Sequence, residues 1–179
     1  MKISEAYRRE QETLHLDPDY GQASVTYAPM LSQIINRLGV TQLLDYGCGK
    51  GRLFQALKVA HEMKLQAYDP GIPAFAGDPV PMQMVACIDV LEHVEPEFLD
   101  AVLDDLVRVT EVVGFFTVCT VAAERTLSDG RNAHLIQRGM AWWFEKLAAR
   151  FDIQTLQVTG DSFFVIVYAQ ARPLVETMQ

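Results

Sequence analysis

The sequence predicts an α/β fold, in which helices cover both faces of a doubly wound and mostly parallel sheet. Short apolar runs alternate with helix-like segments along most of the 179 residues, as expected for parallel strands joined by crossover helices. The run "VVGFFTVCTVA" is apolar on both faces, which is typical of a strand inside a parallel sheet. Near the end, "TGDS" separates two strand-like runs and predicts a hairpin, so the last strand is reversed.

The composition is that of one globular domain. Hydrophobic residues make up 50% and charged residues 21% of the chain, which excludes a disordered protein. We divide the chain into an N-terminal lead-in, residues 1–24, and a domain over residues 25–179. The lead-in is polar and lacks a signal-peptide apolar segment. No apolar run approaches the roughly 20 residues that span a bilayer, so we expect no membrane association.

The spacing of the cysteines and the net charge indicate the cellular location and the classes of partner that we expect. Cys48, Cys87 and Cys119 lie far apart and lack metal-ligand spacing, so we expect reduced thiols, a cytoplasmic location and no metal site. The formal net charge is -8. Because nucleic-acid binding depends on Lys and Arg, this charge disfavours a nucleic-acid partner.

The first half of the chain predicts two helices and two strands. A helix over "TYAPMLSQIINRL" ends at Gly39, and its apolar residues recur at helical spacing: Met30 or Leu31, Ile34, Ile35 and Leu38. An apolar strand follows over residues 40–46. The next helix begins inside a glycine-rich loop and places Leu53, Leu57 and Ala60 on one face. "KLQAYDP" predicts a second strand that ends at Asp69.

Prolines interrupt this alternation between residues 70 and 82. Pro70, Pro73, Pro79 and Pro81 forbid a regular helix there and disfavour a central strand. We therefore expect neither a regular helix nor a central strand in this segment.

The second half resumes the alternation of strands and helices. "MQMVACIDV" predicts a buried strand, and "EPEFLDAVLDDLVRV" predicts a helix with Pro96 in its first turn. Residues 122–139 are polar and read as a loop. "MAWWFEKLAARF" predicts an amphipathic helix with Trp142 off its buried face, which comprises Met140, Trp143, Phe144, Leu147 and Phe151.

The stretch "LLDYGCGKGRLFQAL" places bare backbone at the tip of the first strand. A dinucleotide loop of the form G-x-G-x-x-G would need glycine at position 52, where Arg stands, and the P-loop frame is also absent. The pattern is Asp45-x-Gly47-x-Gly49-x-Gly51. An acid at the strand end repels a pyrophosphate but suits a ligand that carries an ammonium group.

"LLDYGCGKG" resembles the first motif of the class I S-adenosylmethionine-dependent methyltransferases. The resemblance continues at "YDP" and "CIDVLEHV", which match the second and fourth strand ends of that family, and at the closing hairpin. It covers about residues 25 to 170. It implies a Rossmann-like methyltransferase fold, S-adenosyl-L-methionine as cofactor and methyl transfer as the activity.

The resemblance also implies roles for single residues. Gly47, Gly49 and Gly51 would line the methionine part of the cofactor, Asp45 would lie by its amino group, and Asp69 would accept both ribose hydroxyls. Asp89, Val90 and Leu91 would lie near the methyl group. The same binding segments also include Tyr46, Cys48 and Pro70. Family members place a helix and a third strand after the residue at position 69, where this chain has only about a dozen proline-rich residues. The resemblance therefore implies a truncated edge of the sheet, and the adenine contact is unassigned, with Asp78 as a candidate.

Two histidines are candidates for removing a proton from the methyl acceptor. His93 follows the strand "MQMVACIDV", and His134 lies in the loop at the same edge of the sheet. The alternatives are a capping or packing role for His93 and an ordinary polar turn for "DGRNAH". His15 and His61 read as surface residues. We expect Arg131 and Asn132 to contact the acceptor, since such loops carry specificity. Trp142 lies off the buried face of its helix, and it is either a contact with the acceptor or a partner, or a half-covered residue.

These observations favour methyl transfer to oxygen or nitrogen of a small molecule, such as a metabolite or a sugar hydroxyl. Base-amine methyltransferases resemble one another in an Asp/Asn-Pro-Pro-Tyr/Phe sequence where "DVLEH" stands, and Cys87 lacks the Pro-Cys context of cytosine-carbon enzymes. Three alternatives stay open: a cofactor-binding module or partner subunit without catalysis, a methyltransferase that acts on a macromolecule, and a nicotinamide oxidoreductase. The oligomeric state is not predicted.

Overall fold

The computed structural model describes residues 2–170, in which one six-stranded sheet separates two layers of helices. The strand order is β2-β1-β3-β4-β6-β5. Four strands are parallel: β1 (Gln42–Tyr46), β2 (Lys64–Tyr68), β3 (Met82–Ile88) and β4 (Thr110–Cys119). The last strand, β6 (Ser162–Ala169), is antiparallel to both β4 and β5 (Phe151–Thr159). The predicted fold class, with its reversed last strand, is confirmed.

The edge of the sheet at β2 is truncated, as the short proline-rich segment implies. Between Tyr68 and Met82 the chain forms only the 3-10 helix η1 (Pro73–Phe75). Within residues 2–170, no strand lies beyond β2. The same part of the chain holds no helix long and apolar enough to cross a membrane.

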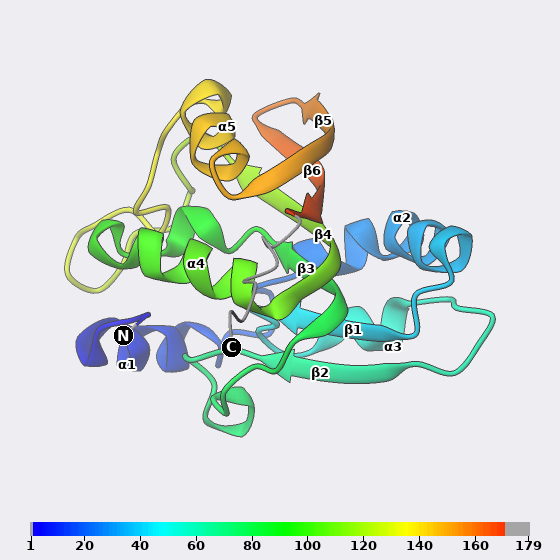
Figure 1. Ribbon diagram of the computed structural model, residues 1–179. Coiled ribbons are helices and arrows are strands. Elements are labelled where there is room, and N and C mark those ends of the chain that lie inside the picture. The colour runs from blue at the N-terminus through cyan, green and yellow to red at the C-terminus, as the bar shows by residue number, and fades with distance from the viewer. Residues whose placement is uncertain (1, 171–179) are drawn as a thin grey trace, which may run out of the picture.

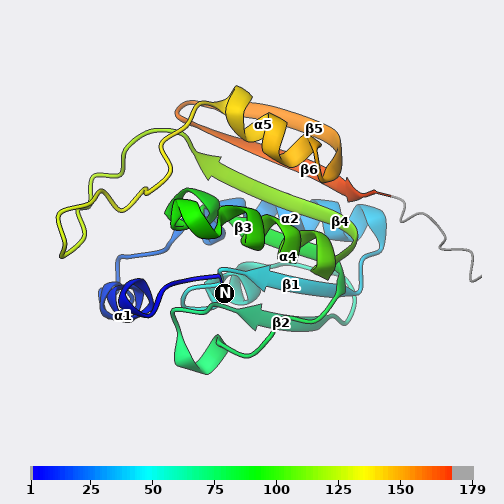
Figure 2. The same ribbon diagram turned by 60° about the vertical axis from the view of Figure 1, so that its left-hand side comes forward.

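The two helical layers cover opposite faces of the sheet (Figures 1 and 2). The helices α2 (Ala23–Leu38) and α3 (Arg52–Ala56) cover one face, and α4 (Leu99–Val109) and α5 (Met140–Ala148) cover the other. Successive strand residues face opposite layers, because side chains alternate along a strand. Met84 packs with α2 and Val85 with α4, which explains why the strand reads as apolar on both faces.

The N-terminal lead-in carries a helix that the sequence analysis did not predict. This helix, α1 (Glu5–Leu14), is capped by Ser4, whose Oγ accepts the Tyr7 N–H at 3.1 Å. Tyr7 and Leu14 form a third apolar cluster with Leu127 and Ala133 of the long loop after β4. In both views α1 lies at the edge toward which the parallel strands point (Figures 1 and 2).

The prediction for α3 was wrong at its C-terminal end. The helix stops at Ala56, and Leu57 is extended, with φ -65 and ψ 140. The backbone N–H groups of Lys58 and Ala60 donate instead to side chains of α2, Ser32 Oγ at 2.9 Å and Asn36 Oδ1 at 3.0 Å. These contacts with α2 replace the next helical turn.

The predicted buried face of α5 was wrong for two residues. Trp143, Leu147 and Phe151 are buried, but Met140 is 37% and Phe144 is 41% exposed. The helix packs against β5, which is an edge strand. A helix at this position buries a narrow stripe rather than a broad face.

Candidate active site

A cavity of about 560 Å³ lies at the carboxyl ends of the parallel strands. This is where ligands bind in open α/β sheets, and the volume is ordinary for a small-molecule site. The four strand ends contribute residues 46–49, 68–70, 88–90 and Cys119. The helix α1, the segment up to Ala23 and the loop after β4 supply the outer wall.

Eight of the eleven residues that the resemblance assigns to the cofactor line this cavity: Tyr46, Gly47, Cys48, Gly49, Asp69, Pro70, Asp89 and Val90. The other three do not line it. Asp45 is buried in β1, just before the glycine loop of residues 47–51, Gly51 caps the start of α3, and Leu91 packs in the core.

The glycine loop is fixed by backbone hydrogen bonds, and it leaves no room for a side chain at Gly47. The N–H groups of Gly47 and Cys48 both donate to the Tyr68 carbonyl, at 2.7 and 3.0 Å, which ties the loop to the end of β2. Gly47 has φ +76, and a Cβ there would lie 2.4 Å from Cγ2 of Val90. Glycine is therefore required at this position for both conformational and steric reasons.

The Asp69 carboxylate joins the glycine loop to the end of β2. Its Oδ2 accepts the Gly49 N–H at 2.9 Å and its Oδ1 accepts the Gly71 N–H at 2.8 Å. Burial raises the pKa of Asp69, and the two backbone bonds oppose that rise. Each oxygen accepts one backbone bond and keeps further lone-pair capacity toward the cavity.

Asp45 is a buried carboxylate without a full set of partners. It is 2% exposed, and its Oδ2 accepts no hydrogen bond from the described residues. Burial, followed by the charge of Asp69, raises its pKa to about 7. An unpartnered buried carboxylate is costly, so a cationic ligand group at this point would satisfy it.

Asp89 lies at the tip of β3 in a strained conformation. Its φ is +50, which is rare outside glycine. The Asp89 N–H donates to Thr117 Oγ1 at 2.8 Å, and the Thr117 hydroxyl donates to the Asp89 carboxylate. These two hydrogen bonds hold the turn after β3 in place, where Asp89 and Val90 line the cavity.

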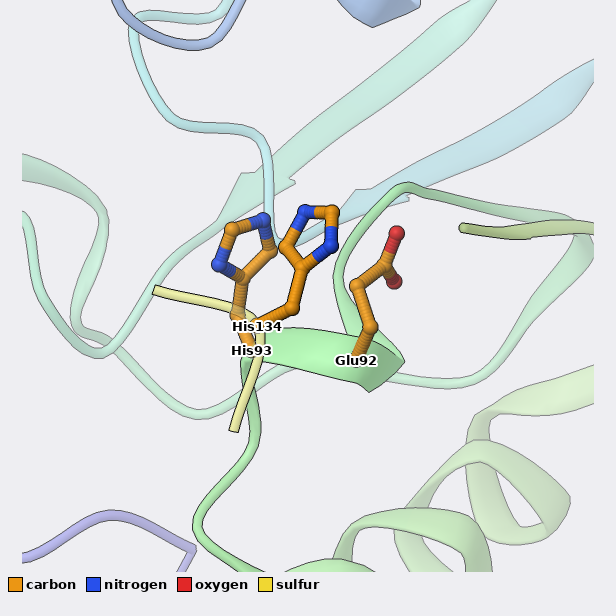
Figure 3. Close-up of side chains that lie close together, drawn as sticks. All are labelled: Glu92, His93 and His134. Atoms are coloured by element: carbon orange, nitrogen blue, oxygen red, sulfur yellow. The ribbon is translucent and has the colours of Figure 1, made fainter. Parts of the chain in front are cut away.

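The two predicted histidines lie side by side at the cavity wall (Figure 3). Their ring centroids are 4.7 Å apart, edge to face. His93 belongs to the turn η2 (Leu91–His93) and does not cap α4, and His134 lies in the loop after β4. Burial, and then His134, lower the pKa of His93 to about 4, so this ring is neutral near pH 7.

The three residues predicted to contact the acceptor do not line the cavity. Arg131 forms an ion pair with Asp129 at 2.7 Å. Asn132 bridges the loop, accepting the Ala123 N–H at 2.9 Å and donating to its carbonyl at 2.8 Å. Trp142 packs on Trp143 and lines a separate groove beside α5. Asp78 is exposed and also lies outside the cavity.

The contribution of α1 was not predicted from the sequence. Tyr7, Gln11 and His15 line the cavity, and each has a buried polar atom without a partner among residues 2–170: Tyr7 Oη, Gln11 Nε2 and His15 Nδ1. The interpretation of His15 as a surface residue was wrong, since burial lowers its pKa and its ring lies against Gly49. Ser4 as a cap and the i, i+4, i+7 spacing of Tyr7, Gln11 and Leu14 were the available signals.

With this topology and cavity, the chain has the fold of the class I S-adenosylmethionine-dependent methyltransferases. No family model matches the sequence, and no curated protein matches it significantly. Among solved structures, it is similar to a 1,6-didemethyltoxoflavin-N1-methyltransferase from Burkholderia thailandensis, bound to 1,6-didemethyltoxoflavin and S-adenosylhomocysteine. The TM-score is 0.67 and the identity 15%, over 96% of this chain and 92% of that one.

Two further similar structures have the same fold. For the mitomycin 7-O-methyltransferase MmcR the TM-score is 0.63 and the identity 14%, over 89% of this chain and 60% of that one. For the magnesium protoporphyrin IX methyltransferase ChlM from Synechocystis PCC 6803, with bound S-adenosylmethionine, the TM-score is 0.59 and the identity 16%, over 91% and 93% of the two chains. At these identities the likeness establishes the fold alone.

Proposed function

We propose that this protein transfers a methyl group from S-adenosyl-L-methionine to oxygen or nitrogen of a small molecule. One observation carries the proposal: Asp69, Asp89 and the glycine loop line one cavity, and Asp45, just before that loop, is buried with an Oδ2 that has no partner among residues 2–170. The bound cofactor supplies an electrophilic methyl group on a sulfonium.

The residues present fit this cofactor. Asp45 offers a buried carboxylate to the ammonium of the methionine part, and the bare backbone at Gly47 and Gly49 admits its chain. Asp69 retains lone pairs for the ribose hydroxyls. The His15 ring occupies the space over Gly49, where a Cβ would lie 2.9 Å from His15 Cε1. We therefore expect this ring to move aside when the cofactor binds.

His93 and His134 are proposed to act on the acceptor. Both line the cavity, beside the residues Asp89 and Val90 that we assign to the methyl region. The two Nδ1 atoms are engaged with backbone carbonyls, which leaves the Nε2 atoms to accept a proton. We retain no acceptor role for Arg131, Asn132 or Trp142, because none reaches the cavity.

A small acceptor is favoured because α1 and the loop after β4 wall the cavity on its outer side. The similar structures support this, since their names give toxoflavin, mitomycin and porphyrin compounds as acceptors.

The three cysteines are free thiols, which supports the proposed cytoplasmic location. We retain the division of the chain into a lead-in, residues 1–24, and the domain that follows it, and we propose that the lead-in covers the cavity of that domain.

Incubation of the protein with methyl-labelled cofactor and a cell extract tests the function. We expect label in low-mass compounds and formation of S-adenosylhomocysteine, detected by mass spectrometry. The control is Gly47→Val, in which the added side chain collides with Val90 and closes the cofactor site. Label in proteins or nucleic acids would support a macromolecular acceptor, and cofactor binding without any labelled product would support the non-catalytic module.

The affinity for S-adenosylhomocysteine should depend on pH through Asp45. Because its pKa is raised to about 7, the free protein holds a proton there below that pH, and an ammonium ligand must displace it. The dissociation constant, measured by calorimetry, should therefore rise as pH falls below about 7, approaching tenfold per pH unit. Asp45→Asn should bind weakly and without this slope; an unchanged slope in the variant would contradict the assignment.

A further inference from the structure

Three side chains from two separate segments converge beside the cavity, which His93 and His134 line and from which Glu92 is buried. Glu92 and His93 belong to η2 after β3, and His134 belongs to the loop after β4. Each offers one ligand atom, and these atoms all lie within 4.8 Å of one another. Figure 3 shows the two rings adjacent and the Glu92 carboxylate next to His134.

The hydrogen bonds of the two rings fix where their lone pairs point. Nδ1 of His93 lies 2.8 Å from the Ala133 carbonyl, and Nδ1 of His134 lies 2.7 Å from the Val121 carbonyl. A carbonyl only accepts, so both Nδ1 atoms carry the proton and donate. In the neutral form of each ring, Nε2 then carries the lone pair. A histidine that binds a metal through one ring nitrogen usually donates the N–H of the other nitrogen to a backbone carbonyl, a carboxylate or water.

Glu92 adds a buried carboxyl group whose second oxygen is not satisfied by the described residues. Its side chain is fully buried, and its Oε1 accepts the Cys119 N–H at 2.8 Å. Its Oε2 has no hydrogen-bond partner among the described residues. Burial, and then the charge of Asp89, raise the pKa of Glu92. A buried carboxyl group with one unpartnered oxygen, whose ligand atom lies within 4.8 Å of a ligand nitrogen on each imidazole, is a set of groups that a cation would satisfy.

We propose that Glu92, His93 and His134 bind a divalent transition-metal ion. Two imidazoles and one carboxylate suit Zn²⁺, Co²⁺ or Fe²⁺ better than Mg²⁺ or Ca²⁺, which prefer oxygen ligands. Bonds of about 2.1 Å place the ligand atoms of a tetrahedral site about 3.4 Å apart, so the three side chains need to close by up to about 1.4 Å. The sequence predicted no metal, because its cysteines lack metal spacing and these three ligands are not a spaced motif.

Such an ion would have open coordination positions toward the cavity. Three protein ligands leave at least one position for another ligand, as in catalytic metal sites. Building on the proposed function, we assign that position to an oxygen of the acceptor, whose hydroxyl pKa a bound metal lowers. The histidines would then hold the ion that activates the acceptor rather than accept the proton themselves.

Metal titration of the protein, first stripped with a chelator, tests the site. Zn²⁺ and Co²⁺ alone are the probes, followed by calorimetry and, for Co²⁺, by visible absorption. We expect one ion per chain in the wild type and in the control His61→Ala, since His61 is exposed and lies before β2, outside the cavity. His134→Ala and Glu92→Gln should each weaken binding by at least about tenfold.

S-adenosylhomocysteine binding on the same samples separates the two proposals. A variant that still binds it is folded, and unchanged metal affinity in such variants would overturn the metal site. A wild-type protein that binds S-adenosylhomocysteine but takes up no ion would overturn it as well. Failure of the wild type to bind S-adenosylhomocysteine would count against the proposed function instead, and the metal titration would still decide the metal site.

Discussion

Replacement of Asp69 by Asn should weaken binding of S-adenosylhomocysteine by roughly 10- to 100-fold, the equivalent of one lost charge-assisted bond of about 1.5–3 kcal/mol. The carboxylate accepts the N–H groups of Gly49 and Gly71 on separate oxygens. An amide presents one oxygen and one NH2, so one of these backbone donors would face another donor. The loop would lose its anchor, and the ribose would lose its charged acceptor.

Asp78→Asn is the matched control for this prediction. The same change is made nine positions along the chain, at an exposed residue outside the cavity. Calorimetric titration of both variants, with melting curves to show that they are folded, gives the comparison. Equal affinities for the two variants would remove Asp69 from the cofactor site.

Trp143→Ala should lower the free energy of unfolding by about 3–5 kcal/mol. Trp143 is the largest of the fully buried side chains, and it lies in the cluster that joins α4 and α5 to the sheet. Its Nε1 has no partner among residues 2–170. The loss should therefore come from apolar burial and the cavity left behind rather than from a hydrogen bond.

The neighbouring residue Phe144 provides the control, because it is also aromatic but 41% exposed. Phe144→Ala should cost less than about 1 kcal/mol, as surface changes do. Urea unfolding of the two variants distinguishes the inward side of α5 from its outward side. A Phe144→Ala cost as large as that of Trp143→Ala would mean that the described orientation of α5 is wrong.

The sheet could be predicted because its signals are local. Prolines between residues 70 and 82 remove the outer strand, and the apolar runs around Met84 and Phe115 predict strands buried on both faces. The glycine spacing after Asp45 likewise predicted the loop that lines the cavity. Each of these features follows from the conformational limits of a single segment.

The remaining features depend on contacts between distant segments. The end of α3 is set by side chains of Ser32 and Asn36 on another helix. The roles of His93 and His134 depend on carbonyls at Ala133 and Val121, which fix the free nitrogen of each ring. No local pattern reveals these partners, which is why the sequence predicted two bases and missed the ligand set that we propose with Glu92.

A crystal structure of the protein with S-adenosylhomocysteine tests the central claim most directly. The ligand should lie along Gly47 and Gly49, with its amino group at Asp45 and its ribose hydroxyls on Asp69, and His15 displaced from the loop. A ligand bound elsewhere, or the same cavity filled by a nicotinamide dinucleotide with its diphosphate on the glycine loop, would contradict the account.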